Sequence, residues 1–223
     1  MVSALAYGRT TNEKVKEESG LMQKIRDINE DEMIAVYLQT EFQSSRFRQD
    51  IAAHLQKEDI DPHLLQAPDW QNGQENALRR TLLGAYRGYG RNAGYFIGFP
   101  TDVRWERATL TRQDLEQVRY IAYDYWVELS GGTRLAVDGA KNAISGKVVF
   151  HVNSDGLVYM ANELQRGAQF PPLILVAKDV DAYLVVMEGH VRLTAYLIAP
   201  EYIPSELEVI IGYSGRLTDW GCY

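Results

Sequence analysis

Four residues that could do chemistry stand together in the stretch VVMEGHVRLTAYLIA, residues 185–199. An apolar run typical of a strand ends at Glu188 and Gly189, and an apolar run typical of a helix follows from His190 and Arg192. The first N–H groups of a helix have no helical partner, and the helix dipole adds positive charge there, so such a turn suits an anion. Gly189 lets a ligand approach the backbone, and Arg192 can reach the same anion with its guanidinium. We therefore expect Gly189 and Arg192 to bind phosphate.

Two further side chains could add reactivity to this turn. A histidine such as His190 can donate to a phosphate or move a proton near neutral pH, and the carboxylate of Glu188 could hold a metal ion beside that phosphate. The sequence thus predicts His190 and Glu188 as catalytic residues and Glu188 as a ligand of Mg²⁺. We also expect the fold to tolerate replacement of Arg192, because a first-turn arginine that faces a pocket supports little packing. The alternative is that the turn serves only the fold, with these charged side chains as its solvated edge.

A second turn has the same layout, in ELSGGTRLAVDGAKNAI, residues 128–144. The pair Gly131 and Gly132 would allow close backbone approach, and Thr133 and Arg134 would then stand at a helix start. We predict that Thr133 and Arg134 also bind the phosphate-bearing ligand, as a second wall on the same side of the sheet as Gly189. The alternative is an ordinary turn with a solvated arginine.

A basic and aromatic segment precedes these turns, in RRTLLGAYRGYGRNAGY, residues 79–95. Arginine combined with tyrosine can bind a nucleic acid or stack on a nucleotide base. The alternative is the solvated face of an amphipathic helix. The residues concerned are Arg79, Arg80, Arg87, Arg91, Tyr86 and Tyr89.

The elements that would position the two turns indicate an α+β fold. Residues 1–20 are polar and without period, which favours a loose arm. Apolar spacing of three and four predicts helices from residue 31, over 44–58 and over 74–87. We then expect strands over 94–99, 102–110, 123–129, 147–152, 171–176, 182–187 and 206–214, with helices over 111–122, 134–144, 154–167 and 189–198. This gives a helical N-terminal region, residues 1–95, and an α+β domain with a mixed β-sheet, residues 96–223.

Composition narrows the class of protein. Of 223 residues, 46% are hydrophobic and 24% charged, as in globular proteins, and the net charge is −7. Overall acidity makes nucleic-acid binding unlikely without excluding it. The single cysteine, Cys222, forms no disulfide within one chain, and there is neither a signal peptide nor an apolar run of 18 residues. We expect a cytoplasmic protein without a membrane segment.

The stretch FPPLILVAKDVDAYLVVMEGHVRLTAY resembles the core of the ParB/sulfiredoxin superfamily. In that family a helix ending in glycine leads to a proline-flanked strand, a second strand, and a Gly-x-x-Arg turn that opens a helix. The resemblance covers residues 155–212 and implies the ParB/sulfiredoxin fold, with Gly189 and Arg192 at the shared glycine and arginine. The Asp-Gly-His-His-Arg motif of the free-serine-kinase branch is the most similar to Glu188–Arg192, although Val191 replaces a polar or basic residue. Sulfiredoxin chemistry is excluded, because His190 stands where that branch has its nucleophilic cysteine.

Two classes of function follow from this resemblance. In the first, the chain is a nucleotide-dependent phosphotransferase or hydrolase that uses ATP, ADP or CTP with Mg²⁺ and a small-molecule acceptor. In the second, it is a non-enzymatic nucleotide-sensing module of the partition-protein type, which regulates a protein or DNA partner. The sequence names neither the nucleotide, the acceptor nor the oligomeric state.

Overall fold

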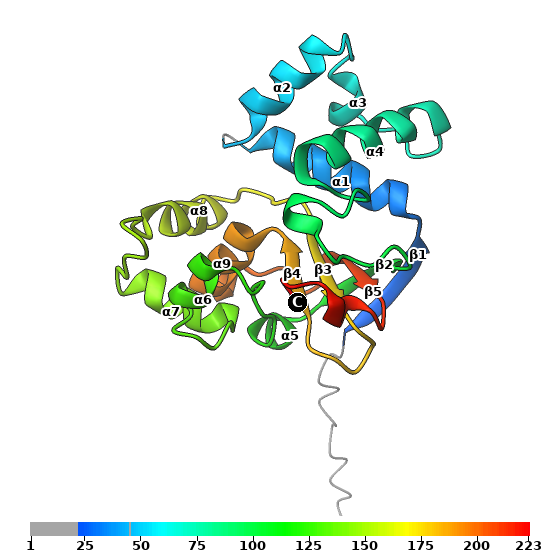
Figure 1. Cartoon of the computed structure of the whole chain (residues 1–223). Coiled ribbons are helices and arrows are strands. Elements are labelled where there is room, and N and C mark those ends of the chain that lie inside the picture. The colour runs from blue at the N-terminus through cyan, green and yellow to red at the C-terminus, as the bar shows by residue number, and fades with distance from the viewer. Residues whose placement is uncertain (1–21, 45) are drawn as a thin grey trace, which may run out of the picture.

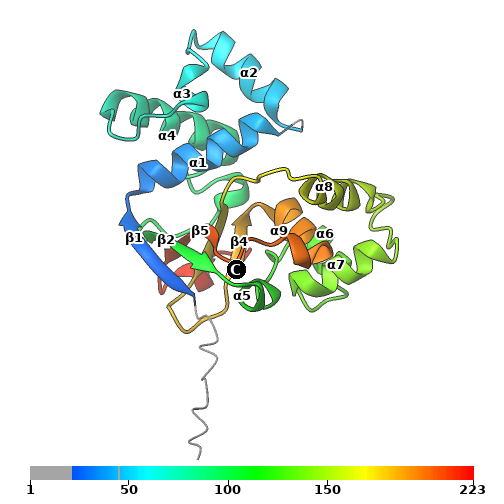
Figure 2. The same ribbon diagram turned by 180° about the vertical axis from the view of Figure 1, so that it is seen from behind.

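The computed structural model describes residues 22–44 and 46–223. The arm expected over residues 1–20 lies outside the described residues. The described chain forms one mixed five-stranded sheet with helices on both faces (Figures 1 and 2). The α+β class is therefore confirmed. Among these residues, no helix is long and apolar enough to cross a membrane.

The sheet has the strand order β1-β2-β5-β3-β4. β3 pairs with β5 in parallel, and the other neighbours are antiparallel. β3 is buried at every position, as expected for a central strand covered on both faces. The strands are β1 (Gln23–Ile28), β2 (Arg104–Leu110), β3 (Leu173–Ala177), β4 (Val185–Glu188) and β5 (Leu207–Tyr213).

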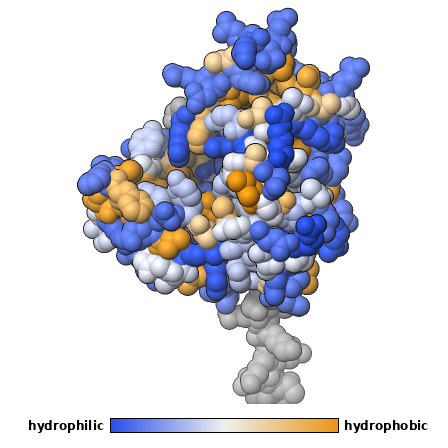
Figure 3. Space-filling model, in the orientation of Figure 1, coloured by the Kyte–Doolittle hydropathy of each residue, from blue (hydrophilic) through white to orange (hydrophobic). Residues whose placement is uncertain are grey.

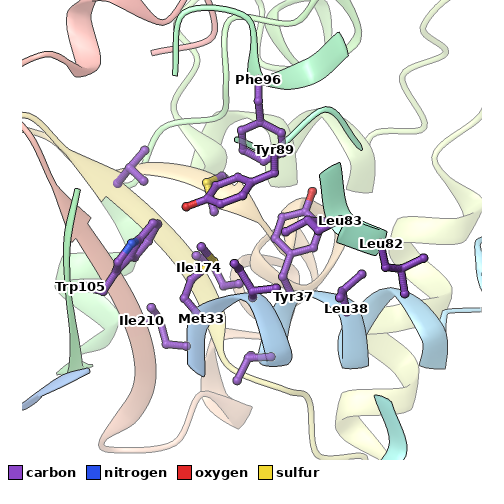
Figure 4. Close-up of a cluster of buried hydrophobic side chains, with 14 of the residues drawn as sticks. Met33, Tyr37, Leu38, Leu82, Leu83, Tyr89, Phe96, Trp105, Ile174 and Ile210 are labelled. Atoms are coloured by element: carbon purple, nitrogen blue, oxygen red, sulfur yellow. The ribbon is translucent and has the colours of Figure 1, made fainter. Parts of the chain in front are cut away.

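Alternate residues of the strands point to two separate cores. Ile174, Val176 and Ile210 join the core under the N-terminal helices, whereas Leu173 and Leu175 join the core under the C-terminal helices. Figure 4 shows Ile174 and Ile210 beside Met33 and Tyr37 of α1. The two-residue period of a strand therefore divides the apolar side chains between the two helical layers.

The helices are α1 (Glu30–Gln43), α2 (Arg48–Lys57), α3 (His63–Gln66), α4 (Gly73–Arg87), α5 (Arg112–Glu116), α6 (Asp124–Leu129), α7 (Ala136–Ile144), α8 (Asp155–Gln165) and α9 (His190–Ile198), with three 3₁₀ turns, η1 (Gly94–Phe96), η2 (Pro200–Tyr202) and η3 (Leu217–Asp219).

The predicted boundary near residue 95 needs a correction. β1 lies inside the region expected to be helical, yet it pairs with β2 at the edge of the sheet. Its sequence QKIRDI is exposed at the first five positions and carries no apolar alternation, so the pattern gave no strand signal. α1 also packs on the sheet, and one apolar core joins both regions. Residues 22–95 are thus mainly helical, but they complete the sheet of the following domain.

Three predicted strands are wrong. Residues 94–99 form η1 and a turn, and residues 123–129 contain α6. Residues 147–152 form a tight turn closed by two hydrogen bonds between Val149 and Val152. Aromatic and β-branched residues favoured a strand in each case, but packing against other elements overrides that weak preference. In α6, Trp126 and Leu129 follow helical spacing and pack on the rest of the domain.

The helix expected over residues 111–122 is shorter than predicted, since α5 ends at Glu116 and Arg119 forms bridges with Leu135 and Val185. The other elements predicted for the C-terminal part are present, and they set up the turn at Gly189. α8 is followed by Gly167 in the left-handed region, then by Pro171 and Pro172, β3, β4, Gly189, α9 and β5. α5 begins with the expected capping box between Thr111 and Asp114. The order of elements over residues 155–212 is the one expected, whereas the ParB/sulfiredoxin fold itself stays a prediction.

Candidate functional site

Gly189 joins β4 to α9 in a conformation that favours glycine. Its φ of 104° lies in the left-handed region, and its carbonyl accepts the first hydrogen bond of α9 from Leu193, at 2.8 Å. A Cβ placed here would lie 2.6 Å from Cδ2 of Leu173 and 2.9 Å from Nη2 of Arg192. Both backbone and packing therefore require glycine, whether or not a ligand approaches.

Arg192 is buried in the protein. It is 6% exposed, and its Nη1 donates to the carbonyl oxygens of Pro171 at 2.5 Å and Pro172 at 3.0 Å. Its Nη2 donates to Glu188 Oε1 at 3.2 Å. Burial lowers the pKa of Arg192, and the charge of Glu188 partly opposes this shift. Arg192 ties the entry of β3 to the turn and does not face a pocket as expected, so its replacement should destabilise the fold.

His190 is the first residue of α9 and packs flat against aromatic rings. Its imidazole stacks on Trp126 at 5.1 Å between centroids and on Tyr120 at 6.3 Å. Nε2 is buried without a hydrogen-bond partner in the described part of the chain. Burial lowers the pKa of His190 to about 3, with a smaller contribution from the charge of Arg192. A proton carrier at neutral pH needs a pKa near that pH, so this environment does not favour the predicted catalytic role.

The Ser130–Arg134 turn uses its polar groups internally. Arg134 has a φ of 62°, and its guanidinium donates to three main-chain oxygens, those of Tyr120, Cys222 and Tyr223. The Thr133 hydroxyl donates to Asp138 at 2.9 Å and accepts from the N–H of Leu135 at 3.1 Å. The turn follows helix α6, where a strand was expected.

Arg134 and Arg192 bond to different segments beside β4. Arg134 bonds to Tyr120, and the residue before Tyr120, Arg119, pairs with Val185 at the start of β4. Arg192 instead bonds to the residues that precede β3, where Ile174 pairs with Glu188 at the end of β4. Thr133 and Arg134 use their side chains for bonds within the protein, and the second wall that they were expected to form beside Gly189 stays a prediction.

The helical region provides the groups that face Glu188. The negative charge of Glu188 acts on Tyr37 and Glu41 of α1 and on Tyr95, and the Tyr95 hydroxyl donates to the carbonyl of Met187 at 3.0 Å. Glu41 is 1% exposed in its side chain and accepts from Arg87 Nε at 2.9 Å. The end of α1 and the end of α4 thus meet the end of β4, and Figure 3 shows the surface drawn inward between this end of the helical region and α8.

Glu41 is a stronger candidate than His190 for proton transfer. Burial raises the pKa of Glu41 to about 7, the Arg87 guanidinium opposes this shift, and Glu188 adds to it. Two arginines lie beside it: the guanidinium carbons of Arg87 and Arg46 lie 4.3 and 4.8 Å from the centre of the Phe47 ring. The charges of Arg87, Arg46 and Glu188 therefore all act on Glu41.

Glu41 and Tyr37 were not among the site residues expected from the sequence, and Arg87 was expected only as part of a basic and aromatic segment. A signal was present, because Glu41 interrupts the apolar face of MIAVYLQTEF, residues 33–42, where a charge has to find a partner. Arg79 of the same basic segment is fully buried and bonds to Leu64, Asp69, Glu75 and Asn76, so it belongs to the fold.

A metal ligand set is not complete at Glu188. Within residues 22–44 and 46–223, no group of three or more His, Cys, Asp or Glu side chains could hold a metal ion. A Mg²⁺ ion is commonly bound through one or two carboxylates together with substrate phosphates. Glu188, with Glu41 nearby, would fit such a shared site.

Comparisons with known proteins add no relative. No family model matches the chain, and neither the curated proteins nor the solved structures contain a significant match.

Proposed function

We propose that this chain binds a nucleotide at the start of α9 and acts on it as a phosphotransferase or hydrolase. The observation that carries the proposal is that β4 ends in Glu188, Gly189 caps α9, and the charge of Glu188 acts on Glu41, which pairs with Arg87 of the helical region. The first N–H groups of α9 have no helical partner and would hold the phosphates. Arg46 and Arg87 would neutralise their charge.

The roles within the site differ from those that residue types alone favour. Arg192 supports the turn through Pro171 and Pro172, and does so without contact to a ligand. Glu41 takes the proton-transfer role, because a carboxyl with a pKa of about 7 can both accept and donate at neutral pH. Glu188 remains the candidate ligand of Mg²⁺, which would neutralise charge on the phosphates.

Val191 gives a direct test of phosphate binding at α9. It is 38% exposed in the first turn, so Val191→Asp places a negative charge where phosphate is proposed to lie. The helix dipole favours an acid there, so the fold should persist. Titration calorimetry with ATP, ADP, CTP and GTP, with and without Mg²⁺, should show binding to the parent chain. Val191→Asp should abolish it, and Val191→Asn should retain it.

Turnover decides between chemistry and sensing. The parent chain should release or transfer phosphate, and Glu41→Gln should lose this turnover while its nucleotide affinity stays within about threefold of the parent. This result supports the hypothesis that the chain is an enzyme. Equal nucleotide affinity in Val191→Asp and in the parent would overturn the site at α9. Arg166→Ala, which removes an exposed arginine that follows α8 and pairs with Glu163, serves as the control for loss of a surface positive charge.

A nucleotide-sensing module is the second candidate, favoured by the position of the site between two regions of the chain. Tyr95 and Met187 join these regions by one hydrogen bond, and the Glu41–Arg87 pair lies beside Glu188. A bound phosphate would compete for Arg87 and loosen this contact. Binding without turnover, together with faster amide exchange in α1 on nucleotide addition, would favour this function.

A further inference from the structure

A second recess lies at the opposite end of α1 from Glu41. It has a volume of about 340 Å³ and is formed by the start of α1, the glycine-containing segment after α4, and η3. This size is at the lower end of the range of small-molecule sites. The recess is lined by Glu30, Tyr89, Gly90, Asn92, Phe96, Gly98, Phe99, Pro100, Thr101, Arg216 and Asp219.

Aromatic rings form an angled wall of this recess. The ring of Phe96 is perpendicular to that of Tyr89, with centroids 4.9 Å apart, and nearly perpendicular to that of Phe99, at 5.2 Å. Tyr89 and Phe99 lie 5.8 Å apart at 49°. Tyr89 and Phe96 are 7% and 1% exposed, and Figure 4 shows them beside Tyr37. Phe99 is partly exposed, so its ring is the part of this wall that a ligand can contact, and the covered rings of Tyr89 and Phe96 pack behind it.

Glu30 at the rim differs from the two acids that follow it. Asp31 forms an ion pair with Arg80, and Glu32 bonds to Arg26 and Arg107. Glu30 has no cation within 4.0 Å in the described residues, and its Oε1 instead accepts a hydrogen bond from the buried Tyr89 hydroxyl at 2.7 Å. A carboxylate fixed by a phenol, at the edge of an aromatic wall, is therefore open to an external cation.

The remainder of the recess is rigid and carries a net negative charge. Asn92, with a φ of 47°, accepts from the N–H of Gly98 at 2.7 Å and so closes the segment between them. Asp219 pairs with Arg216 at 3.5 Å on the surface. Two carboxylates against one guanidinium leave one negative charge among the lining side chains.

We infer that this recess binds a small organic cation, with a primary ammonium group on Glu30 and an apolar body against the ring of Phe99. An ammonium would donate to the Glu30 oxygen that the Tyr89 hydroxyl does not use. Aromatic faces attract cations and accept apolar surface. This site is at the other end of α1 from the proposed nucleotide site, so each can fail without the other.

Calorimetric titration of the full chain with benzylammonium chloride tests the charge preference, with sodium benzoate as a probe of the same shape and opposite charge. We expect saturable binding of benzylammonium and none of benzoate. Equal binding of the two probes, or binding of neither, would overturn the inference.

Variants locate the binding. Glu30→Gln should weaken benzylammonium binding by at least about tenfold, the loss expected for a charged hydrogen bond. Phe99→Leu, which keeps an apolar side chain without a ring, should weaken it about two- to fivefold. Glu201→Gln, an exposed acid in η2, should bind as the parent does. Circular dichroism shows whether the Glu30→Gln chain is folded, and unchanged affinity in the folded variant would also overturn the site. If Glu30→Gln does not fold, Asp219→Asn at the rim takes its place. Asp219→Asn must then weaken the binding of benzylammonium without creating binding of benzoate.

Discussion

The turns at Gly189–Arg192 and Gly131–Arg134 both begin with glycine and end in arginine, but the two arginines have different places in the structure. At Gly189 the chain passes from β4 into α9, and Arg192 lies buried three residues inside the helix. At Gly131 and Gly132 the chain passes from α6 toward α7, and Arg134 lies before the helix in the left-handed region. Both arginines bond to main-chain oxygens, so an arginine beside glycine does not by itself indicate a bound anion.

The difference lies in the N–H groups. In the Ser130–Arg134 turn, the Ser130 hydroxyl accepts from the N–H of Arg134, and the Thr133 hydroxyl accepts from that of Leu135. At the start of α9 the cap is Gly189, which has no side chain to accept a hydrogen bond. Side-chain oxygens thus bind N–H groups in the turn that precedes α7, whereas neither α7 nor α9 has a side-chain cap. The first N–H groups of α9 are left to solvent or a ligand.

The largest expected effect concerns Arg192. Arg192→Ala should lower the free energy of unfolding by about 3–5 kcal/mol, because it leaves Pro171, Pro172 and Glu188 without their buried partner. Urea denaturation followed by circular dichroism measures this loss. Arg166→Ala should change stability by less than about 0.5 kcal/mol. A loss below about 1 kcal/mol for Arg192→Ala would show that the turn does not depend on this arginine.

His190 should make stability depend on pH. Its pKa of about 3 in the folded protein is below the ordinary value of 6.5, so its contribution is present above pH 6.5 and is lost as the pH falls toward 3. Glu41 acts in the opposite sense, since its raised pKa contributes stability that is lost as the pH rises from 4.5 to about 7. In the Glu41→Gln background, stability should therefore fall by about 3 kcal/mol from pH 6.5 to 4.5. Adding His190→Gln should flatten that slope, and an unchanged slope would contradict the burial of His190.

Arg134 should matter less than Arg192. Arg134→Ala should cost about 2 kcal/mol, because three hydrogen bonds to main-chain oxygens are lost from a half-buried site. Arg134→Gly should be more stable than Arg134→Ala by about 1 kcal/mol, since glycine adopts a φ of 62° without cost from Cβ. Hydrogen exchange should show earlier opening of residues 220–223 in both variants, and slower exchange there would contradict the proposed tie.

The smallest effect concerns Thr133. Thr133→Ala should cost about 1 kcal/mol, because the N–H of Leu135 loses its acceptor at the start of α7. Thr133→Ser keeps the hydroxyl and should stay within about 0.5 kcal/mol of the parent in thermal denaturation. Equal losses for Ala and Ser would show that the methyl group, rather than the hydroxyl, provides the stability. At α9, no variant of a capping side chain can be made, because Gly189 has none.

Most elements of the C-terminal part could be predicted because their sequences carry a clear period or a clear cap. The continuous apolar run of β3, the capping box of α5 and the glycine after α8 each act within a few residues. Exposed β1 and the aromatic α6 were missed, since pairing with β2 and packing of Trp126 are long-range effects.

The sequence by itself determined that Glu188, Gly189, His190 and Arg192 adjoin one another at a strand–helix turn, because neighbours along the chain are neighbours in space. It also determined that this turn carries a glycine, an acid and a base. Only the tertiary structure decided which of these groups stay open. Arg192 bonds to Pro171 and Pro172, and His190 packs on Trp126, so neither side chain stays open. The ends of α1 and α4, about a hundred or more residues earlier, supply Glu41 and Arg87, which pair with each other within range of the Glu188 charge. Burial and ionic partners depend on contacts between distant segments, and these contacts set the pKa values of Glu41 and His190.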